Sequence, residues 1–284
     1  MEDIAQHGRD NMNLAEIPIT LLADRVPKGV TTLVFNTEHG RLTVSGSSDY
    51  GLPLAVDGDI IVALLYLTKR ANDFTDPTVN FTKHEIIELL RWKKSGGNYQ
   101  RIADGLNRWV GVTLRYDGCW YDNAIKRKGD ASFHILESVV TYDSEVRAHA
   151  KTLQRDLPFG QFSWNKIFFE SCRSSYVKKL DINTYFSLHS SISRQMMRFL
   201  DKRFYVRKDL TFGLREFAFE NVGLSRNYAD DQIRKKLKPA LDELTAIGFL
   251  KSYEFVSKKR GEWSIRVVAG NLGRGKGGAD VNVY

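Results

Sequence analysis

Residues 99–114, YQRIADGLNRWVGVTL, contain the pattern on which the fold depends. Ile102, Leu106 and Trp109 recur at the spacing of one buried helix face. Val112 and Leu114 then alternate with a polar residue, as in a strand. Basic and amide side chains fill the opposite side of the helix. The stretch therefore predicts a short amphipathic helix that leads directly into a strand and presents a polar face outward.

The same pattern returns in residues 232–250, QIRKKLKPALDELTAIGFL. An offset of 135 residues carries the five apolar positions of the first stretch onto Leu237, Leu241, Leu244, Ile247 and Phe249. A basic loop follows in each half: Lys126, Arg127 and Lys128 form the first basic loop, and Lys258, Lys259 and Arg260 form the second. Amphipathic helices can resemble one another by chance, but helix, strand and basic loop in one order favour an internal duplication.

The elements around the first stretch are in the order of a winged helix, a variant of helix-turn-helix. Residues 59–72 have one apolar face, and Asp57 is the expected N-cap. Thr82 and Glu85 have the spacing of a capping box that starts a second helix. Two strands flank the first basic loop after the third helix. Residues 17–26 and 31–37 predict leading strands around a turn.

The second half predicts a related order. Residues 164–169 and 182–188 have the composition of strands, residues 191–204 form an amphipathic helix, and two strands flank the second basic loop. The fold class is therefore expected to be α+β, with two tandem winged-helix domains related by internal duplication. The expected divisions are an N-terminal domain at 1–150, a C-terminal domain at 151–270 and a Gly-rich tail at 271–284, with a polar connector at 144–160.

Composition supports this organisation. The chain has 284 residues, which favours two domains, and 42 Lys and Arg against 34 Asp and Glu, a net charge of +8 that favours polyanionic partners. The two cysteines, Cys119 and Cys172, are too few for a disulfide framework or a cysteine zinc site. No apolar run is long enough to span a membrane. We expect a cytoplasmic protein without metal or cofactor.

Winged-helix geometry predicts which side chains contact DNA, because the third helix enters the major groove and the hairpin tip approaches the backbone. The alternative is that these side chains belong to solvated helix faces. Pro239 is expected to kink or break the second of these helices. The candidate contacts are Lys93, Gln100, Arg101, Asn107 and Arg108 in the first half, Arg226, Asn227, Tyr228, Gln232, Arg234, Lys235 and Lys238 in the second, and both basic loops.

No catalytic residue is predicted. The sequence lacks a GxxxxGK[ST] phosphate loop, and GRGKGG at 273–278 lacks both its spacing and its following helix. A metal-binding histidine pair with a partner tyrosine, as a strand-nicking protein needs, is also missing. His134 lies in a strand pattern, FHILE. The sequence therefore favours a binding protein over an enzyme.

Four segments together resemble the replication initiator protein A family of plasmids: SGSSDYGLPLAVDGDIIVALL, SGGNYQRIADGLNRWVGVTL, RFLDKRF and LREFAFENVGLSRNYADDQIRKKLKPALDELTAIGFL. The resemblance runs from about residue 17 to residue 250. It implies two winged-helix domains that bind repeated duplex sites at a plasmid origin, help to open it and recruit host helicase or initiator proteins. It also implies a homodimer that represses its own gene, with the first domain serving in dimerisation. DNA contact would fall on the helices around 100–108 and 226–238 and on the basic loops.

Three other functions remain open at this point. A winged-helix transcriptional repressor would use the same two modules at one promoter site. A nuclease or relaxase would need a metal site that the motifs do not reveal. A protein–protein adaptor would respond to DNA weakly and without the salt dependence of phosphate contacts.

Overall fold

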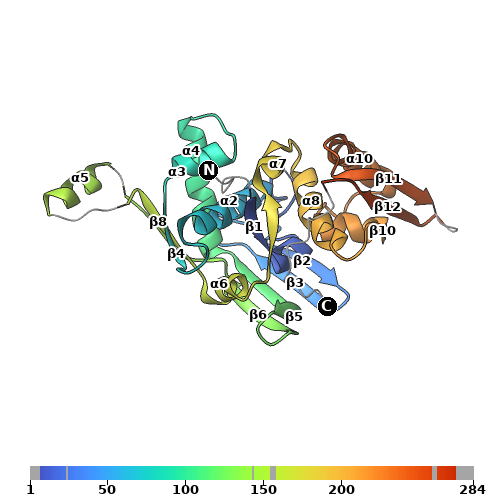
Figure 1. The fold of residues 1–284 in the computed structure, drawn as a ribbon, viewed down its shortest axis with the longest axis horizontal. Coiled ribbons are helices and arrows are strands. Elements are labelled where there is room, and N and C mark those ends of the chain that lie inside the picture. The colour runs from blue at the N-terminus through green and yellow to red at the C-terminus, as the bar shows by residue number, and fades with distance from the viewer. Residues whose placement is uncertain (1–6, 24, 143, 154–157, 258–260, 273–284) are drawn as a thin grey trace.

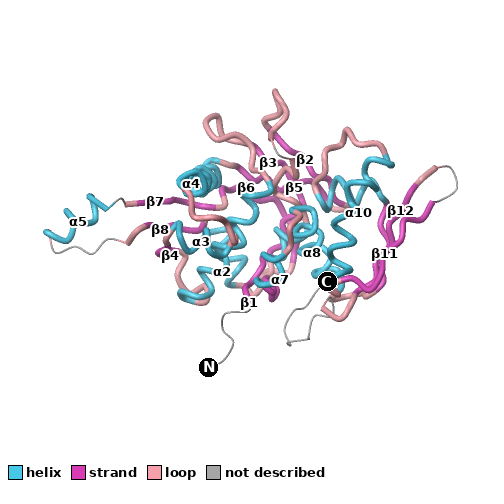
Figure 2. Tube along the Cα trace, turned by 90° about the horizontal axis from the view of Figure 1, so that it is seen from above, coloured by secondary structure: helices cyan, strands magenta, loops and turns pink. Residues whose placement is uncertain are grey.

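The computed structural model describes residues 7–272 except 24, 143, 154–157 and 258–260, and contains both helices and antiparallel sheets. The molecule is elongated, with a central body, an arm that ends in helix α5 on one side and a β-hairpin on the other (Figure 1). A view from above shows the same two extensions at opposite ends of the body (Figure 2).

One group of elements in the first half follows the order helix, strand, helix, helix, strand, strand. It consists of α2 (Ala55–Asn72), β4 (Thr78–Phe81), α3 (Lys83–Leu89), α4 (Gly96–Gly111), β7 (Leu136–Thr141) and β8 (Gly160–Trp164). The strands form an antiparallel sheet in the order β4-β8-β7. Helix α5 (Ser144–Thr152) lies between β7 and β8 and forms the projecting arm.

A second group repeats this order near the C-terminus. It consists of α8 (Ser191–Phe204), β10 (Asp209–Gly213), α9 (Leu214–Glu216) continuing into the π-helical turn η1 (Phe217–Val222), α10 (Asp230–Ala246), β11 (Leu250–Ser257) and β12 (Trp263–Ala269). Its sheet has the order β10-β12-β11. The first strand therefore pairs with the last one in both groups.

The strand pair after α4 differs from the expected arrangement. Strands β5 (Thr113–Asp122) and β6 (Arg127–His134) join β2 (Thr32–Thr37) and β3 (Gly40–Ser45) in a separate sheet, β2-β3-β5-β6. Leu114 and Tyr116 of β5 pair with Val44 and Leu42 of β3, and all four side chains are buried. Strand β5 thus packs into the core of the first half through the sheet with β3. Strands β5 and β6 are an insertion between α4 and β7 of the first group.

Two sheets contain strands from both sides of residue 150, where the domain boundary is expected. Strand β8 pairs with β4 and β7, and β1 (His7–Asn11) pairs with β9 (Val177–Asp181). Helix α5 and strand β8 therefore belong to the first group, and the expected boundary at residue 150 falls inside that group. The buried apolar side chains of both halves also form one large continuous cluster.

Two expected strands are helices. Residues 164–169 fall largely in α6 (Lys166–Arg173), and residues 182–188 fall in α7 (Ile182–Ser187). Asn165 and Asp181 explain this, because each side chain precedes its helix and accepts a hydrogen bond from a backbone N–H of the first turn. Their apolar residues recur with helical spacing that short windows do not distinguish from a strand.

The expectation for residues 17–26 was also wrong, whereas that for 31–37 was correct. Ile17, Ile19 and Leu21 are buried, but this segment contributes one isolated bridge, from Leu21 to Leu54, and no described strand. It follows helix α1 (Met12–Glu16) as an extended connection. The alternating apolar residues of this segment are therefore buried by packing against the core, without the backbone pairing of a strand.

The helix ends test the capping expectations. Thr82 and Glu85 form the expected capping box at α3. Asp57 lies three residues inside α2, where its carboxylate accepts a hydrogen bond from the N–H of Leu54 at 2.7 Å, and is not the N-cap. Helix α10 continues through Pro239, so the expected break is absent there.

Helix α8 carries a stripe of basic residues that pair with acids from the first half. The guanidinium of Arg198 donates two hydrogen bonds to Asp10, at 2.7 and 2.9 Å, and Lys202 lies 2.8 Å from Glu16. Arg194 pairs with Asp59. These three bases lie four residues apart, so they share one face of the helix. We call them, with their three acids, the α8 seam.

Burial sets the electrostatics of the seam. Burial alone would raise the pKa of Asp10, but Arg198, Lys178 and the backbone N–H of Asn11 together outweigh it, so the pKa of that carboxyl lies below its usual value. Arg198 and Asp10 are almost completely buried. Lys178 lies 3.9 Å from the same carboxylate, but Arg198 makes the two side-chain hydrogen bonds to it. A buried charge that loses such bonds is costly, so Asp10 depends mainly on Arg198.

We predict that Arg198→Met lowers the free energy of unfolding by about 3 kcal/mol, because it removes both hydrogen bonds to the buried Asp10 carboxylate and leaves only Lys178, 3.9 Å away, as a charge partner. Urea denaturation measures this change. Arg266→Met is the matched control: it breaks an exposed pair with Asp209 and should change stability by no more than about 1 kcal/mol. Equal effects of the two substitutions would contradict the importance of the seam.

Candidate nucleic-acid interface

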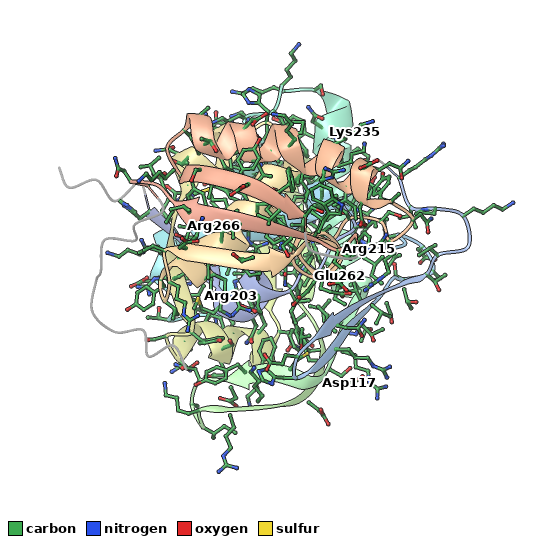
Figure 3. All side chains as sticks on the ribbon, turned by 90° about the vertical axis from the view of Figure 1, so that its right-hand side faces the viewer. Asp117, Arg203, Arg215, Lys235, Glu262 and Arg266 are labelled. Atoms are coloured by element: carbon green, nitrogen blue, oxygen red, sulfur yellow. The ribbon has the colours of Figure 1, made fainter. Side chains whose placement is uncertain are left out.

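Helices α4 and α10 lie on the same side of the molecule. Both lie in the upper part of Figure 1, with α7 and α8 between them, whereas the turn between β5 and β6 lies at the bottom. Figure 3 shows the same separation at one end of the molecule, where Lys235 of α10 lies near the top and Asp117 of β5 near the bottom. A single flat or cylindrical partner could therefore touch α4 and α10 together, but not the β5–β6 turn as well.

Four of the candidate residues in the first half are exposed. Lys93 lies in the loop before α4, and Arg101 lies over the ring of Trp92, 5.1 Å from its centre. Gln100 donates a hydrogen bond to Asp104 at 2.8 Å, and Asn107 donates one to the hydroxyl of Tyr50 at 3.2 Å. These bonds are on the surface and can exchange with a ligand.

Arg108 is not an outward contact. Its guanidinium lies 2.6 Å from Asp57 and donates a hydrogen bond to the carbonyl of Tyr50 at 2.8 Å. Burial raises the pKa of Asp57, and the opposing effect of Arg108 does not fully compensate. Arg108 therefore holds α4 to the start of α2, a role that periodicity alone did not indicate because its position is at the edge of the buried face.

The first basic loop is far from α4. Lys126 donates a hydrogen bond to the side chain of Asn123 at 2.8 Å, and Arg127 and Lys128 are exposed at the start of β6. Because β5–β6 belongs to the other sheet, the structure does not bring this loop together with the candidate helix residues. The arm between β7 and β8 lies in the topological position expected of the loop.

Arg226 is engaged within the protein. It pairs with Glu220 at 2.7 Å and donates a hydrogen bond to the carbonyl of Val34 in β2 at 3.0 Å. It therefore ties η1 to the first half. Asn227 is exposed, and Tyr228 is partly buried against the core.

Helix α10 presents fewer free groups than its sequence indicated. Gln232 accepts a hydrogen bond from the N–H of Ala229 at 3.0 Å, which caps the helix. Arg234 pairs with Asp231 and lies over the ring of Trp263, 3.7 Å from its centre. Lys238 lies 2.9 Å from Asp242. Within the described ranges, Lys235 is exposed and makes no ion pair.

Sequence reasoning missed Lys236, which is exposed beside Lys235. Its ammonium lies 5.9 Å from the centre of the Tyr228 ring. The buried face of α10 includes Ile233 and Ala240 as well as Leu237. When the buried face is defined by all three residues, Lys236 is assigned to the outward face of the helix. Lys258, Lys259 and Arg260, the second basic loop, lie outside the described residues.

Acidic groups limit where an anion can approach α10. Asp230 and Asp231 occupy its first turn, and Arg215 lies 2.8 Å from Asp230. Carboxylates at a helix N-terminus neutralise the partial positive charge of the helix dipole and repel other anions, so they disfavour phosphate binding there. Lys235 and Lys236, one turn further along, are better placed to meet a phosphate or a base edge.

Both cysteines, Cys119 and Cys172, are buried. Burial raises the pKa of Cys119 to about 11 and that of Cys172 to about 12, so neither is a ready nucleophile. Within the described ranges, no three His, Cys, Asp or Glu side chains are grouped to hold a metal ion. Nor is any helix in that part of the chain both long and apolar enough to cross a bilayer.

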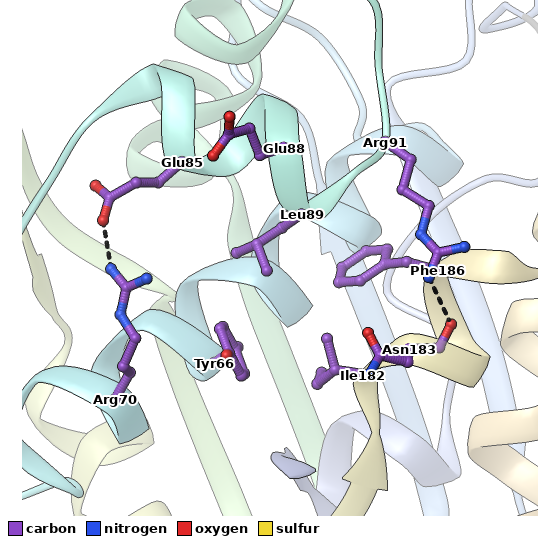
Figure 4. A pocket seen from close by; sticks show the side chains of 9 residues that line it. All are labelled: Tyr66, Arg70, Glu85, Glu88, Leu89, Arg91, Ile182, Asn183 and Phe186. Carbon is purple, nitrogen blue, oxygen red and sulfur yellow. Dashed lines mark hydrogen bonds and ion pairs between the residues drawn. The ribbon is translucent and has the colours of Figure 1, made fainter. Parts of the chain in front are cut away.

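A cavity of about 230 Å³ lies where the two halves meet, between α2, α3 and α7 (Figure 4). Its arginines are engaged: Arg70 pairs with Glu85, and Arg91 donates a hydrogen bond to the carbonyl of Asn183 at 3.3 Å. The second of these bonds is a further tie between the first half and α7.

Comparison with known proteins defines the class of this chain. The family description "Replication initiator protein A" matches residues 9–220, which is most of the chain. The protein therefore belongs to the replication initiator protein A family, and replication initiation is its function. No curated protein matches the sequence.

Two crystal structures of RctB domains share the fold at low sequence identity. A selenomethionine derivative of domains 2 and 3 of RctB has a TM-score of 0.61 at 17% identity, covering 91% of this chain and 98% of that one. A second crystal structure of RctB domains 2–3 has a TM-score of 0.55 at 17% identity, covering 90% and 96%. The Pi initiator protein in complex with iteron DNA has a TM-score of 0.48 at 12% identity, covering 76% and 93%.

We predict that Arg108→Ala lowers the free energy of unfolding by about 3 kcal/mol, because Asp57 loses its buried partner. Gln100→Ala, in the same helix, should change it by no more than about 0.5 kcal/mol. Thermal and urea unfolding of the two variants measure the difference. If Arg108→Ala left stability unchanged, its assignment as an internal tie would be wrong.

Proposed function

We propose that the protein initiates plasmid replication by binding repeated duplex sites at the origin through α4 and α10. The supporting observation is the repeated order of elements, which presents two amphipathic helices on one side of the molecule. Each helix carries exposed amide or basic side chains, the groups that read base edges and hold phosphates. Membership of the initiator family supports the same reading.

We further propose that both groups of elements are winged helices. In each, the first strand pairs with the last one, and the last two strands form the hairpin. The first wing is then the arm between β7 and β8, which carries His149 and Lys151 on its surface. The second wing is the hairpin β11–β12, and the second basic loop lies between these two strands in the sequence.

The proposed contacts are a reduced set of the candidates, with Lys236 added. Lys93, Gln100, Arg101 and Asn107 serve the first helix, and Asn227, Lys235 and Lys236 serve the second. Arg108 and Arg226 instead hold the helices in place, and Gln232, Arg234 and Lys238 are already engaged within α10 or its neighbours.

The proposed mechanism is binding without catalysis. Several bound protomers would bend the origin, at a cost of about 1–6 kcal/mol for tens of degrees, which additional contacts offset. The proposal includes action in the cytoplasm, recruitment of host helicase or initiator proteins and a homodimer that represses its own gene. Nicking of supercoiled plasmid by the pure protein with a divalent metal would contradict it.

A footprint on the DNA flanking the gene tests the proposal. We expect several evenly spaced protected repeats, whose protection weakens as salt rises because bound cations are released from the phosphates. A single protected promoter site would indicate a transcriptional repressor instead. Absence of protection at every salt concentration would favour a protein–protein adaptor.

Two charge-removal variants locate the interface. Lys235→Ala with Lys236→Ala should weaken duplex binding and lower the slope of log K against log salt by about 2, because each lysine neutralises one phosphate in the proposed complex. Changing Lys126, Arg127 and Lys128 to Ala together removes more charge but should leave the slope unchanged, because this loop lies on the opposite side. The reverse result would place DNA on the β5–β6 turn.

A further inference from the structure

The N-terminal part of α2 contacts both halves of the molecule through two neighbouring carboxylates. Asp57 and Asp59 flank Gly58 in the sequence DGD, and both carboxylates are almost completely buried. Asp57 pairs with Arg108 of α4, and Asp59 pairs with Arg194 of α8. We call residues 57–59, with these two arginines, the joint.

Helix α4 is seated directly on the joint. Besides the pair between Arg108 and Asp57, the indole of Trp109 donates a hydrogen bond to the carbonyl of Asp57 at 2.7 Å. Gly105 allows the close approach, because a Cβ there would lie 2.5 Å from Ile60 and 2.8 Å from the Asp57 carboxylate. The position of α4 is thus fixed at three successive points along one face.

Helix α8 is fixed at the other carboxylate. Asp59 accepts hydrogen bonds from Arg194 and from the hydroxyl of Tyr185, the latter at 2.8 Å. Arg194 also donates to the carbonyl of Leu188 at 2.7 Å, which orients its guanidinium. The remaining pairs of the α8 seam, Arg198 with Asp10 and Lys202 with Glu16, hold the same helix further along.

Helix α10 is in turn attached to the start of α8. The carboxylate of Glu243 accepts a hydrogen bond from the N–H of His189 at 2.7 Å and lies 2.5 Å from the hydroxyl of Ser193. A continuous series of short polar contacts therefore connects α4 to α2, α2 to α8 and α8 to α10. The connection passes through helices and not through a long loop.

We propose that the joint sets the distance and rotational phase between α4 and α10, and so makes Asp59 and Arg194 determinants of the spacing of the DNA half-sites that the protein accepts. This inference rests on the proposed function, in which both helices contact one duplex. B-DNA turns once in about 10–10.5 base pairs, so a rigid protein binds two half-sites in only one phase.

The chemistry of the joint suits this role. Apolar side chains tolerate small shifts past one another, whereas a buried carboxylate held by an arginine and a tyrosine has one favourable geometry. Buried ion pairs often add little net stability, and setting the register between elements is their best-attested use. Replacing Asp59 and Arg194 by uncharged residues of similar volume should therefore widen the range of α4–α10 distances more than it lowers the stability of the fold.

The test compares binding to the footprinted site with binding to the same site lengthened by about five base pairs, half a helical turn, between its two protected halves. Wild-type protein should bind the lengthened site at least about tenfold more weakly, because half a turn moves one half-site to the far side of the duplex. The double variant Asp59→Asn with Arg194→Met should reduce this ratio to about two or less. The amide oxygen introduced at position 59 can still accept the hydrogen bond from Tyr185.

Asp209→Asn with Arg266→Met is the matched control, because it removes an exposed Arg–Asp pair with the same change in charge. It should keep the wild-type ratio. A folded joint variant with the wild-type ratio, or a wild-type protein indifferent to the insertion, would overturn the inference while leaving DNA binding intact. Failure of wild-type protein to protect any DNA would instead overturn the proposed function, and this inference with it.

A measurement on wild-type geometry covers the case in which the joint variant does not fold. Spin labels at Gln100→Cys and Lys235→Cys report the distance between α4 and α10 in the absence of DNA. The inference requires one narrow distance distribution in the free protein, and DNA is left out because both labels replace proposed DNA contacts. A broad or two-peaked distribution would show that the joint does not fix the helices.

Discussion

The pairing of Arg194 with Asp59 is the constraint on which the arrangement of the two halves depends. It joins the first helix of the second group to the first helix of the first group, and Asp57, on the other side of Gly58, seats α4. Burial raises the pKa of Asp59, and Arg194 offsets this only in part, so the carboxylate depends on its partners to stay charged. Arg198 and Lys202 extend the same basic face of α8.

This arrangement separates two tasks that basic residues perform in a basic protein. Arg108, Arg194, Arg198 and Arg226 are engaged in pairs that hold helices, and their charges are largely balanced by nearby carboxylates. Lys235 and Lys236 are exposed on α10 and are available to an anionic partner. Arginine suits the first task because its planar fork matches a carboxylate, and lysine suits the second as a mobile charge.

The amphipathic helices could be predicted from sequence because Ile102, Leu106 and Trp109, like Leu237, Leu241 and Leu244, follow helical spacing over several turns. The pairing of β5, the strand after α4, could not be predicted from sequence, because its partner β3 lies far away in the chain. The position of the first basic loop was mispredicted for the same reason, because this loop connects β5 to β6 in the separate sheet. Single residues such as Arg108 were misassigned because an outward edge position becomes internal once α2 packs against it.

Site-specific photo-crosslinking tests the central claim, that α4 and α10 contact one duplex together. A photoreactive phenylalanine analogue would replace Gln100 in one sample, Lys235 in a second and Lys126 in a third, each bound to the footprinted DNA. We expect crosslinks from the first two positions at a fixed separation within the same repeat, and none from the third. Crosslinks from Lys126, or from only one of the two helices, would contradict it.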